Sequence, residues 1–492
     1  MTVSTPRPRE PQTPPRPAGS STTRTALALV AASLPMFMST LDNLVMTTAL
    51  PVIRHDLSAS LEQLQWMVNA YTLAFASLMI AAATLGDRVG RRRTFVLGIA
   101  LFGAGSVASA LAGSAGMLVA ARAVQGAGSA AILPLSLTLL AGAVPQERRA
   151  MAIGVWGALS GLGVALGPVI GGAVVDGLSW QAIFWINVPV AVVSIPFVLR
   201  ALPESFGRRQ RLDLTGVVLA GLGVLSVVWG VVRADDDGWT SAAVLGRLVL
   251  GAVLLAAFVR RERRTDHPLI PLRLFAVRSF TVANIAGFAF AVGVFGVIFV
   301  LSQYLQISLG YTPLQAGLRT LPWTAAPMLV APLAGLLAPR TGVRPLLTAG
   351  LALQAAGLAW IGLLVTGTTS YPAVVPGLVL AGVGMGLTFA PSATAVLADM
   401  TESEHGTASS VNATVRELGT ALGVAVIVAV FQAAGGTLTP DGYAAGLRPA
   451  ILVGAAVIAV AAAVALFMPA VTGRPAASAP AVRTPAGAVQ PA

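Results

Sequence analysis

Cysteine is absent from this 492-residue chain, which excludes disulfide bonds, thiolate metal sites and cysteine nucleophiles. Lysine is absent as well, because all 31 basic residues are Arg. Without Lys the chain has neither a Walker A phosphate loop nor a Schiff-base lysine, so it is not itself an ATP-driven pump of that type. Charged residues make up only 10 % of the sequence, against about a quarter in soluble domains. An ordinary soluble enzyme is therefore excluded.

Apolar residues take the place of the missing charge. They form 56 % of the chain, and the mean hydropathy is +0.81. About fourteen apolar runs reach the length of about 20 residues that a helix needs to cross a bilayer. Because lipid forces backbone groups to pair within a segment, and the alternation of a membrane barrel is absent, every span is predicted to be helical. The predicted fold class is an all-α integral membrane protein.

The Arg residues are distributed unevenly along the chain. With the amino terminus placed in the cytoplasm, 24 of the 31 Arg fall in cytoplasmic segments and three in outer loops. Such a bias orients membrane proteins, so it predicts an even number of spans with both termini cytoplasmic. The net charge of +12 is then a matter of topology, and nucleic-acid binding is not expected.

The spans divide into two halves around a central insertion. Two similar basic turns, Leu85–Arg93 and Ala338–Arg344, each follow a span and indicate an internal repeat, which is the usual plan of secondary transporters. The predicted domains are a disordered Pro- and Arg-rich cytoplasmic tail at 1–24, a six-helix bundle at 25–206, two inserted transmembrane helices at 207–270, a second six-helix bundle at 271–468 and a disordered tail at 469–492.

Ionisable residues inside spans are the candidate chemical groups, because each costs about 2.5–3.5 kcal/mol to insert. Asp42 in the first span is the favoured proton carrier, since a carboxyl in a partly dry cavity can load and release a proton near neutral pH. Arg122 in the fourth span is expected to hold Asp42 ionised. Alternatively, Asp42 makes only a structural hydrogen bond and Arg122 only anchors backbone carbonyls. Glu417 is the second candidate carrier, and its neighbour Arg416 points about 100° away from it.

The fifth span contains a stretch of small residues. Gly163 and Gly167 form a GxxxG step that lets another backbone approach closely, and Pro168 bends the helix. With Gly171 and Gly172 they predict a smooth, kinked face, suited to a moving interface or to close packing alone.

The turn after the second span is a candidate gate. One acid stands there among basic residues, so charge-assisted bonds can staple the helix ends and break as the halves move. The alternative is a topology signal without a switching role. The gate residues are Asp87, Arg88, Gly90, Arg91 and Arg92.

Taken in order, these stretches resemble the major facilitator superfamily, and within it the fourteen-helix drug:proton antiporter branch. The resemblance covers nearly the whole chain outside the tails. Pro339 stands where the family's second-half turn has an Asp, so a symmetric gate is not expected. The stretches that carry the resemblance are Leu41–Pro51, Ala83–Arg93, Arg122–Gly128, Gly163–Gly172, Trp180–Pro189, Tyr304–Pro322 and Gly406–Gly423.

The resemblance implies two six-helix bundles plus two extra central helices, working by alternating access in a bacterial inner membrane. Proton influx would drive export of an amphipathic drug or a secreted metabolite. The protein would function as a monomer, without cofactor, metal or catalytic activity. Two alternatives stay open: an uptake symporter on the same fold, and a membrane sensor or scaffold that does not transport. The expected substrate cavity is lined by Asn43, Gln125, Trp66, Tyr71, Phe295, Phe299 and Trp323.

Overall fold

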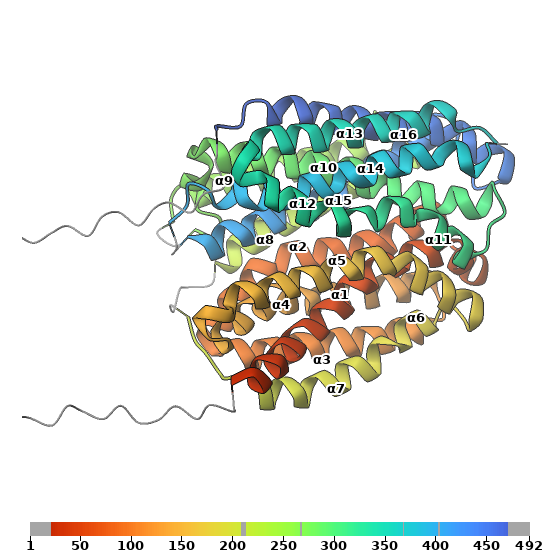
Figure 1. Ribbon diagram of the computed structural model, residues 1–492. Coiled ribbons are helices and arrows are strands. Elements are labelled where there is room, and N and C mark those ends of the chain that lie inside the picture. The colour runs from red at the N-terminus through yellow and green to blue at the C-terminus, as the bar shows by residue number, and fades with distance from the viewer. Residues whose placement is uncertain (1–20, 208–212, 266–267, 368, 402–403, 471–492) are drawn as a thin grey trace, which may run out of the picture.

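The computed structural model describes residues 21–207, 213–265, 268–367, 369–401 and 404–470, and these ranges contain helices and no strand (Figure 1). Most of both predicted tails, residues 1–20 and 471–492, lies outside the described residues. The first helix begins at Ser21 and therefore includes the last four residues of the predicted tail.

The helices fall into three groups along the chain. The N-terminal bundle contains α1 (Ser21–Leu57), α2 (Leu61–Val89), α3 (Arg91–Ala110), α4 (Ala115–Ala143), α5 (Gln146–Gly177), α6 (Ala182–Trp185) and α7 (Asn187–Ala201). The inserted hairpin consists of α8 (Leu214–Asp237) and α9 (Ala242–Glu262). The C-terminal bundle contains the 3-10 helix η1 (Leu272–Ala276), α10 (Arg278–Ile307), α11 (Pro313–Thr324), α12 (Ala326–Thr341), α13 (Val343–Leu364), α14 (Tyr371–Leu397), α15 (His405–Ala433) and α16 (Pro440–Ala465).

Fourteen segments of the described chain are long and apolar enough to cross a membrane. In this count α6 with α7 forms one segment, and α11 with α12 forms another. The predicted number of spans is therefore confirmed. Proline lies close to both interruptions, Pro189 in α7 and Pro322 and Pro327 around the break at Ala325, and proline disrupts helical hydrogen bonding.

The two basic turns that suggested an internal repeat have similar backbones. Gly90 joins α2 to α3 with φ +124°, and Gly342 joins α12 to α13 with φ +85°. Glycine adopts this left-handed region without steric cost. Each glycine N–H also bonds back into the preceding helix, to Gly86 O and to Ala338 O. The turns thus occupy equivalent places in the two bundles.

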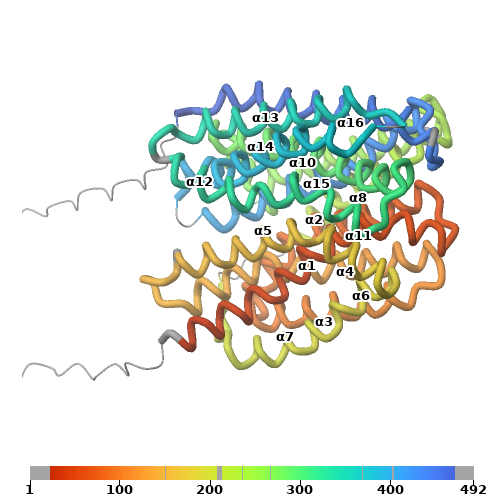
Figure 2. The backbone as a smooth tube through the Cα atoms, turned by 45° about the vertical axis from the view of Figure 1, so that its right-hand side comes forward, coloured from red at the N-terminus to blue at the C-terminus, as the bar shows by residue number. Residues whose placement is uncertain are grey.

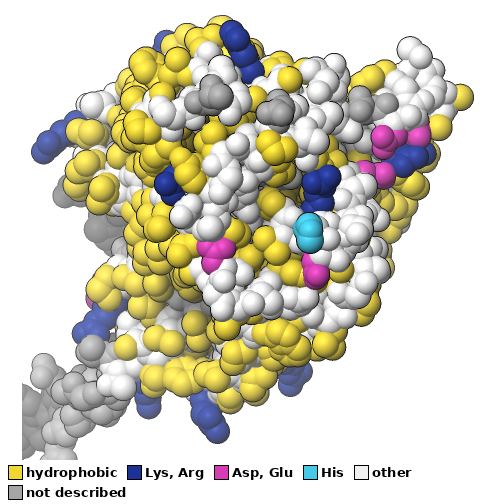
Figure 3. Space-filling view, turned by 90° about the vertical axis from the view of Figure 1, so that its right-hand side faces the viewer, with side chains coloured by type: hydrophobic (Ala, Val, Ile, Leu, Met, Phe, Trp, Pro, Cys, Tyr) yellow, Lys and Arg dark blue, Asp and Glu magenta, His cyan; other side chains and the backbone are white. Residues whose placement is uncertain are grey.

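The two bundles lie side by side and their helices cross the molecule from end to end (Figures 1 and 2). We call the end at which residues 21 and 470 lie the terminus side, and the end at which α5 finishes at Gly177 and α11 begins at Pro313 the far side. The bundles meet mainly through α5 with α11 and through α2 with α15. Seen from the far side, acidic and basic side chains are scattered and form no continuous basic surface (Figure 3).

Hydrogen bonds between the bundles gather toward the far side in the described chain. Ser302 Oγ donates to Thr47 O at 3.1 Å, and Gln306 Nε2 donates to Thr48 O at 3.1 Å. Pro51 explains the first acceptor: it has no N–H to bond the carbonyl four residues earlier, so Thr47 O is free to accept from the other bundle. Leu314 N, at the start of α11, donates to the Asp176 carboxylate at 3.0 Å. The bundles are therefore closed against each other on the far side.

Candidate functional site

A buried ion pair lies inside the N-terminal bundle. Asp42 of α1 is 4 % exposed and Arg122 of α4 is fully buried. Arg122 Nη1 donates to Asp42 Oδ2 and, at 2.9 Å, to Gln125 Oε1, while Arg122 Nε donates to Met67 O at 3.2 Å. The structure thus brings together the two charges that the sequence placed in separate spans.

Neutral polar groups from α3, α4 and α7 complete the surroundings of the carboxylate. Asn187 Nδ2 donates to Asp42 Oδ1 at 2.7 Å, and Gln125 Nε2 approaches the same oxygen at 3.4 Å. Ser106 Oγ accepts from both amides, at 2.7 Å from Gln125 and 3.3 Å from Asn187. Asn187 and Ser106 were not predicted, although an uncharged polar residue within an apolar span was a weak signal for each.

Arg122 keeps several partners that do not depend on Asp42. Its guanidinium carbon lies 4.4 Å from the centre of the Tyr71 ring, a cation–π distance. Tyr71 is held in place because its hydroxyl bonds Ser129 at 2.7 Å and Ser39 at 3.1 Å. Tyr71 and Gln125 were expected in a substrate cavity, but here they surround the arginine. Arg122 would therefore keep these partners if the charge of Asp42 were removed.

The glycines of α5 seat this helix directly on α1. A methyl group placed on Gly167 would lie 2.7 Å from Leu44 Cβ, and one on Gly171 would lie 2.6 Å from Thr48 Oγ1. Gly163 packs beside Thr40 in the same way. The three glycines recur every four residues, so they share one helix face, and α1 lies close against that face.

Gly172 lies on another face of α5 and meets the C-terminal bundle. A methyl group there would overlap the main chain of Pro313 and Leu314 in α11. Reciprocally, a methyl group on Gly317 of α11 would overlap the main chain at Pro168. The small-residue stretch therefore serves both the packing of α5 on α1 and the closure of the two bundles.

The basic turn after α2 is tied to the end of α7. Asp87 Oδ1 accepts from Arg91 Nε at 2.7 Å, and Asp87 O accepts from Gly207 N at 3.0 Å. Arg92 Nη1 donates to Leu199 O at 3.1 Å, while Arg88 is exposed. In the described chain these polar contacts all stay within the N-terminal bundle, whereas the predicted staple was expected to break as the halves move. A switching role stays a prediction.

Glu204 is the central partner of this turn, and sequence reasoning missed it. Glu204 Oε1 accepts from Arg92 N at 2.9 Å. A methyl group on Gly90 would lie 2.9 Å from the Glu204 carboxyl carbon. Glycine is thus required at position 90 both by its φ and by the approach of this acid. The 112 residues between Glu204 and Arg92 explain why no local motif revealed the contact.

The second candidate acid lies in the other bundle. Arg416 and Glu417 of α15 are half-buried and form no ion pair within the described residues. The Arg416 guanidinium carbon is 5.4 Å from the centre of the Phe389 ring, and its side chain passes Gly287 of α10. Glu417 therefore lacks the set of donors that surrounds Asp42.

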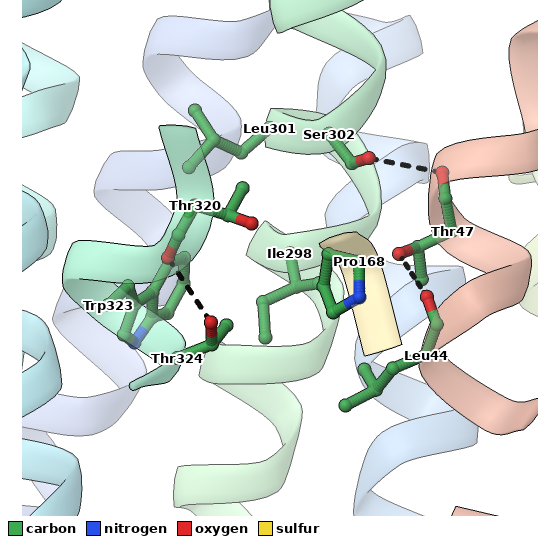
Figure 4. A pocket seen from close by; sticks show the side chains of 9 residues that line it. All are labelled: Leu44, Thr47, Pro168, Ile298, Leu301, Ser302, Thr320, Trp323 and Thr324. Carbon is green, nitrogen blue, oxygen red and sulfur yellow. Dashed lines mark hydrogen bonds between the residues drawn. The ribbon is translucent and has the colours of Figure 1, made fainter. Parts of the chain in front are cut away.

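A small pocket lies between the bundles, where α1 and α5 face α10 and α11 (Figure 4). Its volume is about 10 Å³, which is room for about one water molecule. The hydroxyl groups lining it donate to main-chain carbonyls, as Thr47 does to Leu44 O and Thr320 to Gly317 O, both at 2.8 Å. The pocket has no charged side chain. Its lining residues are Leu44, Thr47, Pro168, Ile298, Leu301, Ser302, Thr320, Trp323 and Thr324.

Of the residues expected in a substrate cavity, Trp323 lines this small pocket and the others lie elsewhere. Phe299 is buried in the hydrophobic core, and Phe295 packs against the same core. Trp66 lies two turns before Leu73 on α2 and packs against the buried cluster that α2 forms with α8 and α15. Asn43 is half-buried next to Asp42. The sequence does not show which way an aromatic side chain in an apolar span points. It therefore could not distinguish residues that line a cavity from residues packed in the hydrophobic core.

Comparison with known proteins agrees with this architecture. The sequence pattern of the Major Facilitator Superfamily matches residues 32–424 and, in a second match, 283–490. The chain belongs to this superfamily.

Several superfamily members are similar over most of their length. The multidrug resistance protein Stp of Mycobacterium tuberculosis is 37 % identical over 411 residues, which cover 83 % of this chain and 76 % of Stp. The multidrug efflux pump LfrA of Mycolicibacterium smegmatis is 35 % identical, with 84 % and 83 % covered. The tetracenomycin C resistance and export protein of Streptomyces glaucescens is 34 % identical, with 86 % and 79 % covered.

Solved structures support the superfamily fold. A D-xylose–proton symporter aligns with a TM-score of 0.66 at 16 % identity, covering 91 % of this chain and 99 % of its own. A bacterial homologue of the lysosomal transporter Spinster, in an inward-facing and unoccupied conformation, gives 0.65 at 18 % identity, with 91 % and 98 % covered. At these identities the likeness concerns the fold alone.

Proposed function

We propose that this protein is a proton-coupled exporter that moves amphipathic drugs or a secreted metabolite across a bacterial inner membrane by alternating access. The relatives described above are resistance, efflux and export proteins, which supports export. The observation that carries the proposal is the Asp42 carboxylate, buried against an arginine that has other partners. When such a carboxylate binds a proton, the guanidinium still keeps Met67 O, Gln125 Oε1 and the Tyr71 ring as partners.

The proton site is connected to the bundle interface by one helix. Asp42 and Thr47 lie on α1, five residues apart, which corresponds to a rise of about 7.5 Å. Thr47 O accepts from Ser302 of the C-terminal bundle. The charge of Asp42 determines its ion pair with Arg122 and thereby the position of α1, which carries the carbonyls that join the bundles on the far side. For protons to enter, Asp42 takes up a proton while the far side is open, and protonation favours closing of the far side. The proton is then released toward the terminus side, and the re-formed ion pair permits the next opening.

The orientation follows from the arginine bias. With the terminus side in the cytoplasm, the closed far side faces outward, and substrate reaches the central region from the cytoplasm or the inner leaflet. Each proton that enters releases about 2.3 kcal/mol per 100 mV of membrane potential. One proton per cycle therefore supports a useful export gradient.

The test uses everted membrane vesicles with an acidic lumen and a fluorescent hydrophobic cation. An antiporter accumulates the cation in the lumen, whereas a proton symporter would drive it out. We expect Asp42→Asn to lower accumulation at least tenfold and to leave binding of the cation to purified protein unchanged. The matched control is Glu417→Gln, which should retain transport.

Each other result would contradict a stated part of the proposal. Loss of transport in Glu417→Gln with full activity in Asp42→Asn would move the proton site to α15. Unimpaired pumping in both variants would refute coupling through these acids. Wild-type protein that neither binds the cation nor moves protons would favour the sensor or scaffold alternative.

A further inference from the structure

The inserted hairpin covers the line along which α2 and α15 meet, which we call the α2–α15 seam. Helix α8 lies beside both helices in two views and contacts both (Figures 1 and 2). One buried cluster joins the three helices, so α8 contacts one helix from each bundle along the same line. The members of this cluster are Leu73 of α2, Val224, Val228, Val231 and Val232 of α8, and Ala421, Ala425 and Ala429 of α15.

Helix α8 is fixed to α2 by polar and close contacts. Arg233 Nη1 of α8 donates to Glu62 Oε2 of α2 at 2.9 Å. Arg233 Nη2 also donates to Asp237 Oδ1 at 2.8 Å, which orients the arginine toward α2. Nearer the middle of the span, a Cβ on Gly221 would lie 3.3 Å from Ser77 Cβ. These contacts bind the hairpin to the N-terminal bundle at two levels.

The contact between α8 and α15 is of a different kind. In the described chain no hydrogen bond or ion pair joins these two helices. The α15 side presents Ala421, Ala425 and Ala429, which are four residues apart and therefore share one helix face. Leu418, Leu422 and Val426 of α15 pack against the same cluster and flank this face. The alanine face itself carries only methyl groups, so α8 can slide along it between its larger neighbours.

Helix α9 turns its side chains to the surroundings of the molecule. Val249 is 60 % exposed and Val253 is 58 % exposed, as expected for a lipid-facing surface. The base of the hairpin is closed by Arg261, whose guanidinium contacts Asp213 at 2.7 Å. The hairpin is thus a closed unit with one face to lipid and the other over the α2–α15 seam.

We propose that the α8–α9 hairpin is a moving lipid seal, which travels with the N-terminal bundle and slides over the alanine face of α15 during the transport cycle. This inference rests on the proposed alternating-access function. Rocking of two bundles changes the spacing of helices across their boundary, and an uncovered boundary would admit lipid chains. A cover attached to both bundles would block the motion, whereas one attached only to α2 permits it.

The chain has no cysteine, so paired cysteines can be introduced without background. The first pair, Ser77→Cys with Gly221→Cys, joins α8 to α2. The second pair, Val228→Cys with Ala425→Cys, joins α8 to α15. In both pairs the two cysteines are oxidised to a disulfide in vesicles with copper phenanthroline, which partitions into the bilayer, and bridging is quantified by mass spectrometry. We expect the first bridged protein to keep at least half of its proton-driven cation transport and the second to lose at least 90 %.

The unbridged double variants are the controls for the proposed function. If they do not transport, the failure concerns that function or folding, and pairs one turn away, Leu73→Cys with Val224→Cys and Val224→Cys with Ala421→Cys, replace them. Transport by the α8–α15 bridged protein would overturn the sliding contact. Loss of transport on bridging α8 to α2 would overturn the attachment to the N-terminal bundle.

A second measurement tests the seal itself. A lipid carrying a photoactivatable diazirine should label Val249 and Val253 during turnover and leave Leu73 and Ala421 unlabelled. Labelling of Leu73 or Ala421 comparable to that of Val249 would show that lipid reaches the seam, and the seal would be refuted.

Discussion

The buried ion pair permits a prediction in which stability and pH are linked. Arg122→Gln removes the guanidinium and leaves the Asp42 carboxylate in a buried site with two amide donors, Asn187 at 2.7 Å and Gln125 at 3.4 Å. Removing one partner of a buried ion pair typically costs about 3–5 kcal/mol. We expect a loss of this size at pH 9, where the carboxyl is charged.

The reverse substitution should cost less. In Asp42→Asn the arginine keeps Met67 O, Gln125 Oε1 and the Tyr71 ring. Its destabilisation should therefore be below the range of about 3–5 kcal/mol for breaking a buried pair. In the double variant Asp42→Asn with Arg122→Gln neither charge remains, so its loss of unfolding free energy should be smaller than that of Arg122→Gln alone. The resulting coupling energy should be about 2–3 kcal/mol, within the range for residues in direct contact.

The pH dependence has a definite sign. Arg122→Gln buries a lone carboxylate, and a proton removes that charge. Its deficit relative to wild type should therefore shrink as the pH falls from 9 to 5, whereas the deficit of the double variant should not change. Thermal unfolding of the purified proteins in detergent at pH 5, 7 and 9 measures both effects. A deficit of Arg122→Gln that is independent of pH, or a double variant no more stable than Arg122→Gln, would refute the reasoning.

Three further predictions concern the turn, the bundle contact and the hairpin base. Gly90→Ala should destabilise the protein by at least about 1–2 kcal/mol, because alanine is strained at the φ of this position. Adding Glu204→Ala should remove only the further cost of the clash between the new methyl group and the Glu204 carboxyl, and thermal unfolding measures both effects. Gly172→Leu should prevent closure of the far side and lower transport at least tenfold, whereas Gly157→Leu, on the same helix but with open space beside it, should be neutral. Burial of Asp213 opposes ionisation, but bonds from α9 and from its own helix start outweigh it and hold its pKa below the usual value. The ionised Asp213 carboxylate therefore stabilises the hairpin base at pH 7, and this stabilisation is lost as the pH falls below about 4. Limited proteolysis should show that acid exposes the wild-type hairpin base, and that in Asp213→Asn the cleavage rate there no longer depends on pH in this range.

The helices could be predicted from sequence because the bilayer leaves an apolar segment one solution, whatever its neighbours are. The ion pair was accessible for a similar reason: a charge such as Asp42 or Arg122 in a span is costly, so it must find a partner. Asn187 and Ser106 were not found, because a neutral polar residue is inexpensive enough to occur without a special role. Glu204 was missed because its partners lie in a distant turn.

The sequence could not show which neighbouring helix each aromatic side chain faces. Trp66 and Trp323 both stand in apolar spans, yet one packs under the hairpin and the other lines the pocket between bundles. Nothing in their local sequence distinguishes them, because the choice depends on which neighbouring helix covers that face. The same limit applies to Tyr71, whose ring lies against the Arg122 guanidinium.

Helix α1 shows how a short sequence can carry both ends of a coupling mechanism. Asp42 meets Arg122 inside the N-terminal bundle. Nine residues later, Pro51 leaves Thr47 O without a helical donor, and that carbonyl instead accepts from Ser302 of the other bundle. In the proposed mechanism, a proton that changes the charge of Asp42 therefore acts on the same helix that holds the bundles together on the far side. The proposed coupling needs no relay of side chains, because one helix spans the distance.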